Sequence, residues 1–542
     1  MTDNPLGDNP NETLLELNEQ IVTDPDGVYK KLFSINSIDD FADAPALNII
    51  GLLVDASGDT GKKDGINHAI DLAEELLDRD LPPGHRSRIH YDLGNAFSHL
   101  RRLNAVDSGS WWWENDDLEQ EIYHFRMALD PDGIAEIRDI EACKTYTNLG
   151  NALSEVGRVV EAIRCWNHAL EIDPAFAQAK GQKGIGFHSY ARAHYDNGHT
   201  ATFLRAAYEQ LDEAVAADGL FPPMKEYFEG VQQHIADQFK PGVLDEEMEF
   251  EEYSLGDSDE EKKYRQWCLE QTLFLNPLND LGANSIAAQD ILHLGSVSGE
   301  ESSKIVSCVG FYNQMKQEYV SARYLLYEGL YNDEPHFSDK DVRLENTLDY
   351  PVYSFNAEKV RIAMRMAYSL FDKIASFIQY YFDLSHIPSH KLNFGNVWYK
   401  SQGRNKLAPA FDGHENWALR GLFWLSKDLE FFSEMYVESS MDPGAKELRD
   451  TRNELEHGYL KLHEPMWVGP DAESRLRDDL AISLYRSDFE ELSLKSLRKA
   501  RSALIYLSLA IQWEEQAKNE NLDDDEILAP VRLGHWEDEW KR

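Results

Sequence analysis

One stretch in the first third of the chain holds eight residues at the spacing of a helical hairpin. Counted from Cys143, positions 4, 7, 8, 11, 20, 24, 27 and 32 are Tyr146, Leu149, Gly150, Leu153, Ala162, Trp166, Ala169 and Pro174. The small residues Gly150 and Ala162 let two antiparallel helices approach closely, and Trp166 can fill the groove between them. Such a hairpin cannot bury its apolar face alone, so the pattern predicts a stack of similar units.

This hairpin resembles a tetratricopeptide repeat (TPR), whose pattern has the same residue types at these positions. Degenerate copies flank it: one opens at residues 91–97 and closes near 128, and another opens at 184–187 and closes near 214. A helix over 66–77 resembles the second half of a fourth unit. We therefore expect a TPR-like repeat domain over residues 40–240, after an N-terminal segment of residues 1–39.

The rest of the chain is also helical in pattern. Val/Ile/Thr alternation is scarce, whereas apolar residues recur at helical spacing. An acidic linker is expected over 241–264, a helical domain over 265–520 and an acidic C-terminal tail over 521–542. Within the helical domain, helices are expected over about 309–330, 357–384, 417–436, 445–461 and 493–518. The predicted fold class is all-α, with a TPR-like helical-hairpin solenoid followed by a helical bundle.

The formal net charge of −44 is distributed unevenly. Residues 1–350 carry 28 Lys+Arg against 65 Asp+Glu, a net of −37, whereas residues 351–542 carry 25 against 32, a net of −7. The acidic front repels nucleic acid, because phosphates carry the same charge. It equally fits a protein adapted to high salt, where long-range repulsion is screened. Any RNA contact is therefore expected in the nearly neutral part of the chain.

The sequence lacks the signatures of secreted and membrane proteins. The N-terminus shows no basic segment followed by an apolar one, and no window approaches about 18 consecutive apolar residues. The cysteines form no C-x-x-C pair, which argues against a disulfide framework and a cysteine zinc site; they are Cys143, Cys165, Cys268 and Cys308. We expect a soluble cytoplasmic protein that contacts no membrane.

Common nucleotide-binding and hydrolase motifs are also missing. Residues 58–63 imitate a P-loop, but Ala56 stands where the first glycine belongs and Lys63 where the final Ser or Thr belongs. No H-E-x-x-H set and no G-x-S-x-G elbow appears. His457 and His463 are poorly spaced to share a metal from one helix. We expect neither a metal nor a cofactor.

A different set of side chains points to chemistry on RNA. Arg452, Asn453 and His457 form an R-N-x-x-x-H hexapeptide. Arg can neutralise a phosphorane, a carboxamide can hold an oxygen, and His can move a proton near neutral pH. On an ideal helix Asn453 and His457 share a face with Arg449, whereas Arg452 must curl round or reach across to a partner. Taken alone, such a hexapeptide more often marks a solvated helix face.

The back half of the chain resembles a HEPN domain, the helical-bundle superfamily whose active members are metal-independent ribonucleases. The hallmark of that family is an Arg, a following polar residue and then a His, and it is matched by Arg452, Asn453 and His457. The likeness covers about residues 265–520 and is greatest to the branch in which the domain follows TPR-like repeats. That similarity rests on the sequences at 275–280, 346–351, 368–377 and 397–399.

The resemblance implies an endoribonuclease that cleaves through the substrate's own 2′-hydroxyl and leaves a cyclic phosphate. His457 would act as general base or acid, Arg452 would stabilise the pentavalent phosphate, and Asn453 would orient His457 or a phosphate oxygen. The resemblance also implies a homodimer through the C-terminal bundle, with two motifs in one cleft. A toxin or anti-phage defence effector fits this architecture.

Further candidate residues lie around the motif and on the last long helix. Asp372 and Lys373 either line the same cleft or form a buried salt bridge between helices. Arg449 and Tyr459 flank the motif and are candidates to neutralise or stack on a substrate. The densest basic cluster either tracks an RNA backbone or forms a solvated face; it comprises Lys495, Arg498, Lys499 and Arg501.

Two functional hypotheses follow from these residues. In the first, RNA is the substrate of the C-terminal domain, and the repeats bind a protein, a peptide or a small activator. In the second, the protein is a non-catalytic TPR scaffold whose bundle serves dimerisation or nucleotide binding. The intact Arg, Asn and His favour the first hypothesis, and the acidic front favours a protein-binding role.

Overall fold

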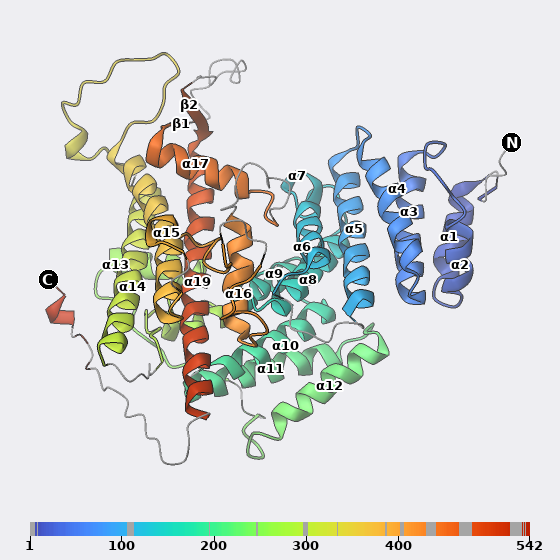
Figure 1. Cartoon of the computed structure of the whole chain (residues 1–542), viewed down its shortest axis with the longest axis horizontal. Coiled ribbons are helices and arrows are strands. Elements are labelled where there is room, and N and C mark those ends of the chain that lie inside the picture. The colour runs from blue at the N-terminus through green and yellow to red at the C-terminus, as the bar shows by residue number, and fades with distance from the viewer. Residues whose placement is uncertain are drawn as a thin grey trace. The chain divides into compact units, whose positions relative to one another are not determined.

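The computed structural model divides the chain into two compact units, which are described separately (Figure 1). Unit 1 comprises the described residues within Met1–Phe187, Ala207–Lys240 and Glu438–Pro443; unit 2 comprises those within His188–Ala206, Pro241–Val437 and Gly444–Arg542. The structure describes residues 6–7, 9–105, 113–194, 196–244, 246, 248–295, 302–332, 334–384, 387–401, 406–429, 441–464, 480–520, 534, 536 and 538–541.

Unit 1 is built from helices that pack in consecutive pairs, α3 with α4, α5 with α6, and α8 with α9. One apolar core joins α1 and α2 to α3, α4 and α5, so the residues before 40 pack with the repeats that follow. The helices are α1 (Pro10–Gln20), α2 (Pro25–Leu32), α3 (Asp43–Thr60), α4 (Lys63–Leu77), α5 (Pro83–Ala105), α6 (Asp116–Ala128), α7 (Pro131–Ile134), α8 (Asp139–Glu155), α9 (Val159–Ile172) and α12 (Pro222–Ala236). Two more helices, α10 (Ala177–Ala193) and α11 (Asn197–Ala216), each contribute residues to both units.

Glycines set the separation within two of these helix pairs. A Cβ atom on Gly150 of α8 would come within 2.5 Å of Nε1 of Trp166 on α9, and one on Gly94 of α5 within 2.6 Å of Cδ1 of Phe125 on α6. Each glycine therefore admits an aromatic ring where a side chain would clash. Trp166 is buried, and its indole N–H donates to Asn151 at 3.1 Å. The helical N-terminal region is thus consistent with the predicted repeats.

Unit 2 is a helical bundle around three long helices, α14 (Ser302–Tyr331), α15 (Phe355–Tyr381) and α19 (Arg486–Glu520) (Figure 1). Helix α15 packs on α14 and α19, and α16 packs on α19. Large buried side chains fill the space between them, among them Phe371, Trp398, Trp424 and Tyr506. The shorter elements are α13 (Asp259–Glu270), α16 (Trp417–Ser426), α17 (Ala445–His457) and the 3-10 helices η1 (Pro277–Leu281), η2 (Ser285–Ala287), η3 (Phe337–Asp339), η4 (Ser389–Lys391), η5 (Lys427–Leu429) and η8 (Asp538–Trp540).

The predicted all-α class is confirmed, with the addition of a small parallel sheet in unit 2. Strand β1 (Tyr459–His463) pairs with β2 (Ala481–Tyr485), with Tyr459 opposite Ala481 and His463 opposite Tyr485. The sequence pattern predicts a helix to residue 461, whereas α17 ends at His457. Gly458 then takes a non-helical backbone conformation and β1 begins at the next residue, so the predicted helix is too long at its C-terminal end.

The predicted bounds of the linker, of one helix and of the tail agree with the structure only in part. Helix α13 begins inside the expected acidic linker of residues 241–264. The helix expected over 417–436 is observed as α16 followed by η5, and residues 430–440 lie outside the described part of the chain. Most of the expected tail over 521–542 also lies outside it. Within the residues that the structure describes, no helix is both long and apolar enough to cross a membrane.

Candidate active site at the end of α17

Helix α17 turns two of the motif side chains away from the bundle. Its buried residues Leu448, Thr451 and Leu455 recur at offsets of three and four, so they form one inward stripe. Asn453 and His457 lie outside that stripe and are exposed. His457 is the last residue of the helix, and its ring makes no hydrogen bond with another described residue. The imidazole and the carboxamide are therefore accessible to a bound molecule.

Arg452 is half-buried at the edge of this stripe and curls toward α15. Its Nη1 donates to Oδ1 of Asn453 at 3.1 Å, and its Cζ lies 5.4 Å from the ring centre of Tyr368. Burial raises the pKa of Asp372, one turn further along α15, and the positive charge of Arg452 partly opposes that rise. The side chain of Arg452 thus curls round within its own chain, and its reach to a partner chain stays a prediction.

The α15 residues beside α17 form a stripe that the sequence reasoning identified only in part. Arg365, Tyr368 and Asp372 are spaced three and four apart, so they share one face of the helix. Arg365 donates to the backbone carbonyl of Leu455, and its Nε lies 4.0 Å from a carboxylate oxygen of Glu456. Its side chain is 40% exposed, which leaves a second cation at the edge of the site. The helical offset from Asp372 is the signal that could have found Arg365 and Tyr368.

The motif and the α15 stripe lie inside one segment that comparison with protein families recognises. Residues 299–514 match the family model described as LA2681-like HEPN. The chain carries an LA2681-like HEPN domain. No curated protein and no solved structure matches the chain. The predicted HEPN resemblance is therefore confirmed for this segment, whereas the roles of individual residues stay predictions.

Asp372 and Lys373 of the HEPN domain point to different helices. Consecutive residues of an α-helix are turned by about 100° from each other. Lys373 accordingly forms an ion pair with Glu318 of α14. The Oδ1 atom of Asp372 is buried and has no hydrogen-bond partner among the described residues. The salt-bridge alternative therefore describes Lys373, and Asp372 remains a candidate beside Arg452.

Arg449 and Tyr459 lie on either side of the motif and have partners within the chain. Nη2 of Arg449 lies 3.0 Å from Oδ1 of the neighbouring Asp450. The hydroxyl of Tyr459, at the start of β1, shares a hydrogen bond of 2.8 Å with the hydroxyl of Tyr353. Burial raises the pKa of Tyr353 to about 12, so the Tyr353 hydroxyl is neutral near neutral pH. Both residues stay candidates for the rim of the site.

Half of the predicted RNA-binding cluster lies inside the bundle. Arg501 is fully buried, with Nη1 2.7 Å from Oδ1 of Asp280 and Nε donating to the carbonyl of Phe274. Lys499 is also buried, and its Nζ lies 2.7 Å from Oδ2 of Asp428. Neither side chain has a surface on which to meet a phosphate. The RNA-binding prediction is therefore wrong for these two residues.

The other two members of the cluster, Lys495 and Arg498, are half-buried. Arg498 donates to the backbone carbonyl and the side-chain oxygen of Gln271. The helical offsets of three and four predict one stripe of α19 for Lys495, Arg498 and Lys499. That helix, however, packs against α14, α15 and α16, so a stripe of cations on it is not necessarily at the surface.

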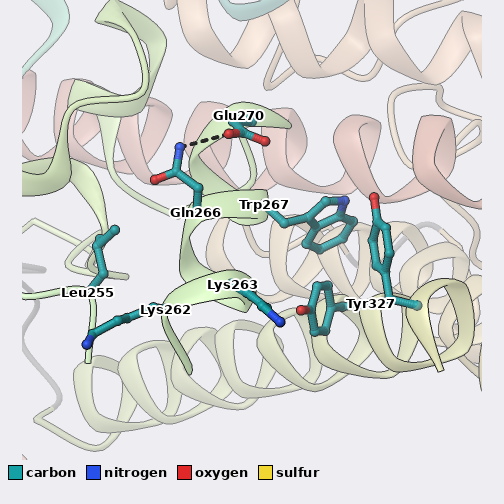
Figure 2. Close-up of a pocket in the computed structure, with 8 residues that line it drawn as sticks. Leu255, Lys262, Lys263, Gln266, Trp267, Glu270 and Tyr327 are labelled. Carbon is teal, nitrogen blue, oxygen red and sulfur yellow. Dashed lines mark hydrogen bonds between the residues drawn. The ribbon is translucent and has the colours of Figure 1, made fainter. Parts of the chain in front are cut away.

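A pocket of about 890 Å³ in unit 2 combines aromatic rings with lysines (Figure 2). The ring centres of Trp267 and Tyr327 are 5.3 Å apart with planes at 49°, and those of Tyr327 and Tyr331 are 5.1 Å apart at 42°. Figure 2 shows Lys263 between Lys262 and the rings. Both lysines are exposed, and neither ammonium group pairs with a carboxylate of the described residues. The motif on α17 does not line this pocket.

Proposed function

We propose that the HEPN domain is an endoribonuclease that needs no metal and cleaves RNA through the substrate's own 2′-hydroxyl. One observation carries the proposal: Asn453 and His457 are exposed on the last turns of α17, and the half-buried Arg452 donates a hydrogen bond to Asn453. HEPN domains are generally ribonucleases, which supports the assignment of the reaction class.

The reaction requires two proton transfers and the stabilisation of negative charge. The 2′-oxygen loses a proton and bonds to phosphorus, while the bond between phosphorus and the 5′-oxygen breaks and that oxygen gains a proton. His457 suits one of these transfers, because imidazole exchanges protons near neutral pH. Arg452 offsets the charge that develops on the pentavalent phosphate, and Asn453 holds Arg452 in place. The products are a 2′,3′-cyclic phosphate and a free 5′-hydroxyl.

We infer that two copies of the chain pair through the C-terminal bundle with their α17 helices facing each other. At this site each chain offers a single histidine, His457, among the residues described, whereas the reaction uses both a base and an acid. A second copy would bring its own His457 to the opposite side of the phosphate. The outward orientation of Asn453 and His457 is compatible with such a shared cleft.

The decisive experiment is cleavage of total RNA by the purified full-length protein in EDTA. The wild type should leave 2′,3′-cyclic phosphate ends, and His457→Ala or Arg452→Ala should slow cleavage by about 10²–10⁴-fold, as expected for a lost proton-transfer or charge-stabilising group. His390→Ala is the matched control, because His390 is exposed on η4 of the same domain. Cleavage that survives in the Arg452→Ala/His457→Ala double variant, or that EDTA abolishes in the wild type, contradicts the mechanism.

We propose that the aromatic pocket beside α13 provides a further RNA contact. Aromatic faces stack on unpaired bases irrespective of sequence, and lysines beside them attract the phosphates. Trp267, Tyr327 and Tyr331 supply the rings, and Lys262 and Lys263 supply the charge. This contact would replace the one expected at the buried part of the basic cluster.

Unit 1 would then regulate the nuclease or recruit a partner to it. We propose that its TPR-like repeats recognise a protein, a peptide or a small activator, as in a toxin or an anti-phage defence effector. The net charge of −22 over residues 1–240, with 20 Lys+Arg against 42 Asp+Glu, supports this division, because it disfavours RNA contact in the repeats.

A non-catalytic scaffold is the second candidate function. The burial of Lys499 and Arg501 favours it, because half of the expected RNA-binding cations are used for internal ion pairs. In that case the bundle would pair two chains or bind a nucleotide, and the wild-type protein would leave RNA intact. The cleavage experiment above therefore separates the two candidates.

A further inference from the structure

Unit 1 contains a polar pocket of about 520 Å³ that the proposed nuclease chemistry does not use. It lies among α1, α3, α5 and α8, and it therefore joins residues that are far apart in the sequence. Asp55 of α3 and Asp92 of α5 line it. On its other walls lie Arg88 of α5 and Glu141 and Lys144 of α8. The pocket thus holds carboxylates from three helices.

Asp92 is a buried carboxylate without a hydrogen-bonding partner on one oxygen. The residue is 8% exposed, and its Oδ2 has no partner among the described residues. A Cβ atom at Gly51 of α3 would lie 3.2 Å from that oxygen, so the glycine leaves room for the carboxylate between the helices. A buried polar group that lacks a partner lowers stability unless a ligand or a proton satisfies it. Burial accordingly raises the pKa of Asp92 well above its ordinary value.

Asp55 lies one helical turn after Gly51 and faces the same pocket. Although part of Asp55 is exposed, the protein atoms packed around its carboxyl group and, second, the charge of Asp59 raise its pKa to about 6. The charge of Asp55 in turn raises the pKa of Asp92, so the two carboxylates interact electrostatically. The free pocket therefore holds two acids that resist ionisation together, and a bound positive charge would relieve that repulsion.

The basic residues of the pocket leave both carboxylates without an ion pair. Arg88 and Lys144 act on Asp92 and Asp55 electrostatically, but neither forms an ion pair with them. Nη2 of Arg88 donates instead to Oδ1 of Asn48 at 2.8 Å. Arg138, at the rim, is paired with Glu141 at 2.7 Å. A cation from outside the chain could therefore form the ion pair that Asp55 and Asp92 lack within it.

We propose that this pocket binds the guanidinium or ammonium group of a cationic ligand between Asp55 and Asp92. The acidity of the surrounding chain favours such a ligand, because residues 1–240 carry 20 Lys+Arg against 42 Asp+Glu, a net of −22. The cation belongs either to an arginine or lysine of a peptide or to a free small molecule. The proposal gives the recognition role of unit 1 a ligand chemistry, and it stands or falls independently of RNA cleavage.

The test is binding of two matched probes to the full-length protein, measured by fluorescence polarisation. The first is a labelled peptide of sequence Gly-Ser-Gly-Arg-Gly-Ser-Gly, and the second carries neutral citrulline in place of arginine. The arginine peptide should bind at least about tenfold more tightly, because a charge-assisted hydrogen bond is roughly twice as strong as a neutral one. Competition by agmatine distinguishes the two sources: agmatine that displaces the peptide at equal concentration assigns the pocket to a small guanidinium compound.

Three variants and one control locate the binding. Asp55→Asn and Asp92→Asn should each weaken the arginine peptide at least about tenfold, whereas Lys144→Gln should tighten it because a competing cation is removed. Asp71→Asn removes the same charge from an exposed position of α4 outside the pocket and should change nothing. The side chain of Asp55 reaches the opening of the pocket and is more exposed than that of Asp92, so its variant keeps the test valid if Asp92→Asn does not fold.

The pH dependence supplies an independent signature. A carboxylate must lose its proton to bind a cation, and the pKa of Asp55 is raised to about 6. Affinity for the arginine peptide should therefore fall at least about fourfold between pH 7.5 and pH 5.5, while the guanidinium itself stays charged. Equal binding of the two peptides, retention of binding in both Asp→Asn variants, or no binding at millimolar concentration overturns the proposal.

Discussion

The ion pair between Arg501 and Asp280 allows a structural and an RNA-binding role of Arg501 to be separated by experiment. Asp280→Asn keeps the size of the side chain and removes only its charge. In the folded state Arg501 is 0% exposed and the side chain of Asp280 is 2% exposed, so water cannot replace the lost carboxylate. The substitution would leave a buried guanidinium without a counter-charge.

The expected destabilisation follows from the contacts that survive. Removing one partner of a buried ion pair costs about 3–5 kcal/mol. Arg501 keeps its hydrogen bonds to the backbone carbonyls of Phe274 and Asn276, which favours the lower end, about 3 kcal/mol. For a domain of this size that corresponds to a fall in melting temperature of roughly 6–12 °C.

Calorimetry of the full-length protein measures this fall in the transition of unit 2. Lys304→Met is the matched control: it breaks the exposed ion pair with Asp383 and should cost less than about 1 kcal/mol. Arg501→Met combined with Asp280→Leu should recover part of the lost stability, since no charge is then left unpaired. A melting temperature of Asp280→Asn within about 2 °C of the wild type would refute the reasoning, because an uncompensated buried charge should lower the free energy of unfolding by more than that.

Four further predictions concern the motif on α17, the aromatic pocket and the polar pocket of unit 1. His457→Ala should lower the single-turnover cleavage rate while leaving RNA affinity nearly unchanged, because His457 moves a proton and does not anchor the substrate; equal losses in both point to a binding role. Lys262→Gln/Lys263→Gln/Tyr331→Ala should raise KM about 5–100-fold at an unchanged saturating rate, as expected when stacking and phosphate contacts are lost; a fall in the saturating rate alone contradicts that role. Light scattering should give the mass of a dimer, and specific activity should fall on dilution; full activity of a monomer rules out the shared cleft. Asp92→Asn should raise the melting temperature of unit 1 more at pH 7.5 than at pH 5, because the free-energy cost of the buried carboxyl group grows as pH rises from its ordinary pKa toward the raised folded value. An effect of equal size at both pH values counts against a raised pKa of Asp92.

Local spacing was sufficient to predict the features that depend on neighbouring residues. The approach of Trp166 to Gly150 needs only one helical hairpin, and the pattern of eight residues specified it. The exposure of Asn453 and His457 likewise follows from the apolar stripe of their own helix. The HEPN resemblance, carried by several dispersed motifs, was confirmed over residues 299–514.

Features that depend on what covers a helix were not predictable in this way. Helical offsets show which side chains share a stripe, but they do not show whether another helix covers that stripe. Lys499 and Arg501 therefore looked like a solvated basic face, although Asp428 and Asp280 come from segments far away in the sequence. For the same reason the sequence did not show that Asp55 and Asp92, among many acidic residues of the front part, line one pocket.

The short sheet next to the motif links the order of the site to local unfolding. Only Gly458 separates His457 from β1, and β1 is held by parallel pairing with β2 and by a backbone hydrogen bond of 2.7 Å from Val352 to Leu462. A sheet of two strands is marginally stable on its own, so this part of the domain is expected to open more readily than the helical core. The amide hydrogens of β1 should then exchange with solvent faster than those of α15, and any ligand that slows their exchange reports that the end of α17 has become ordered.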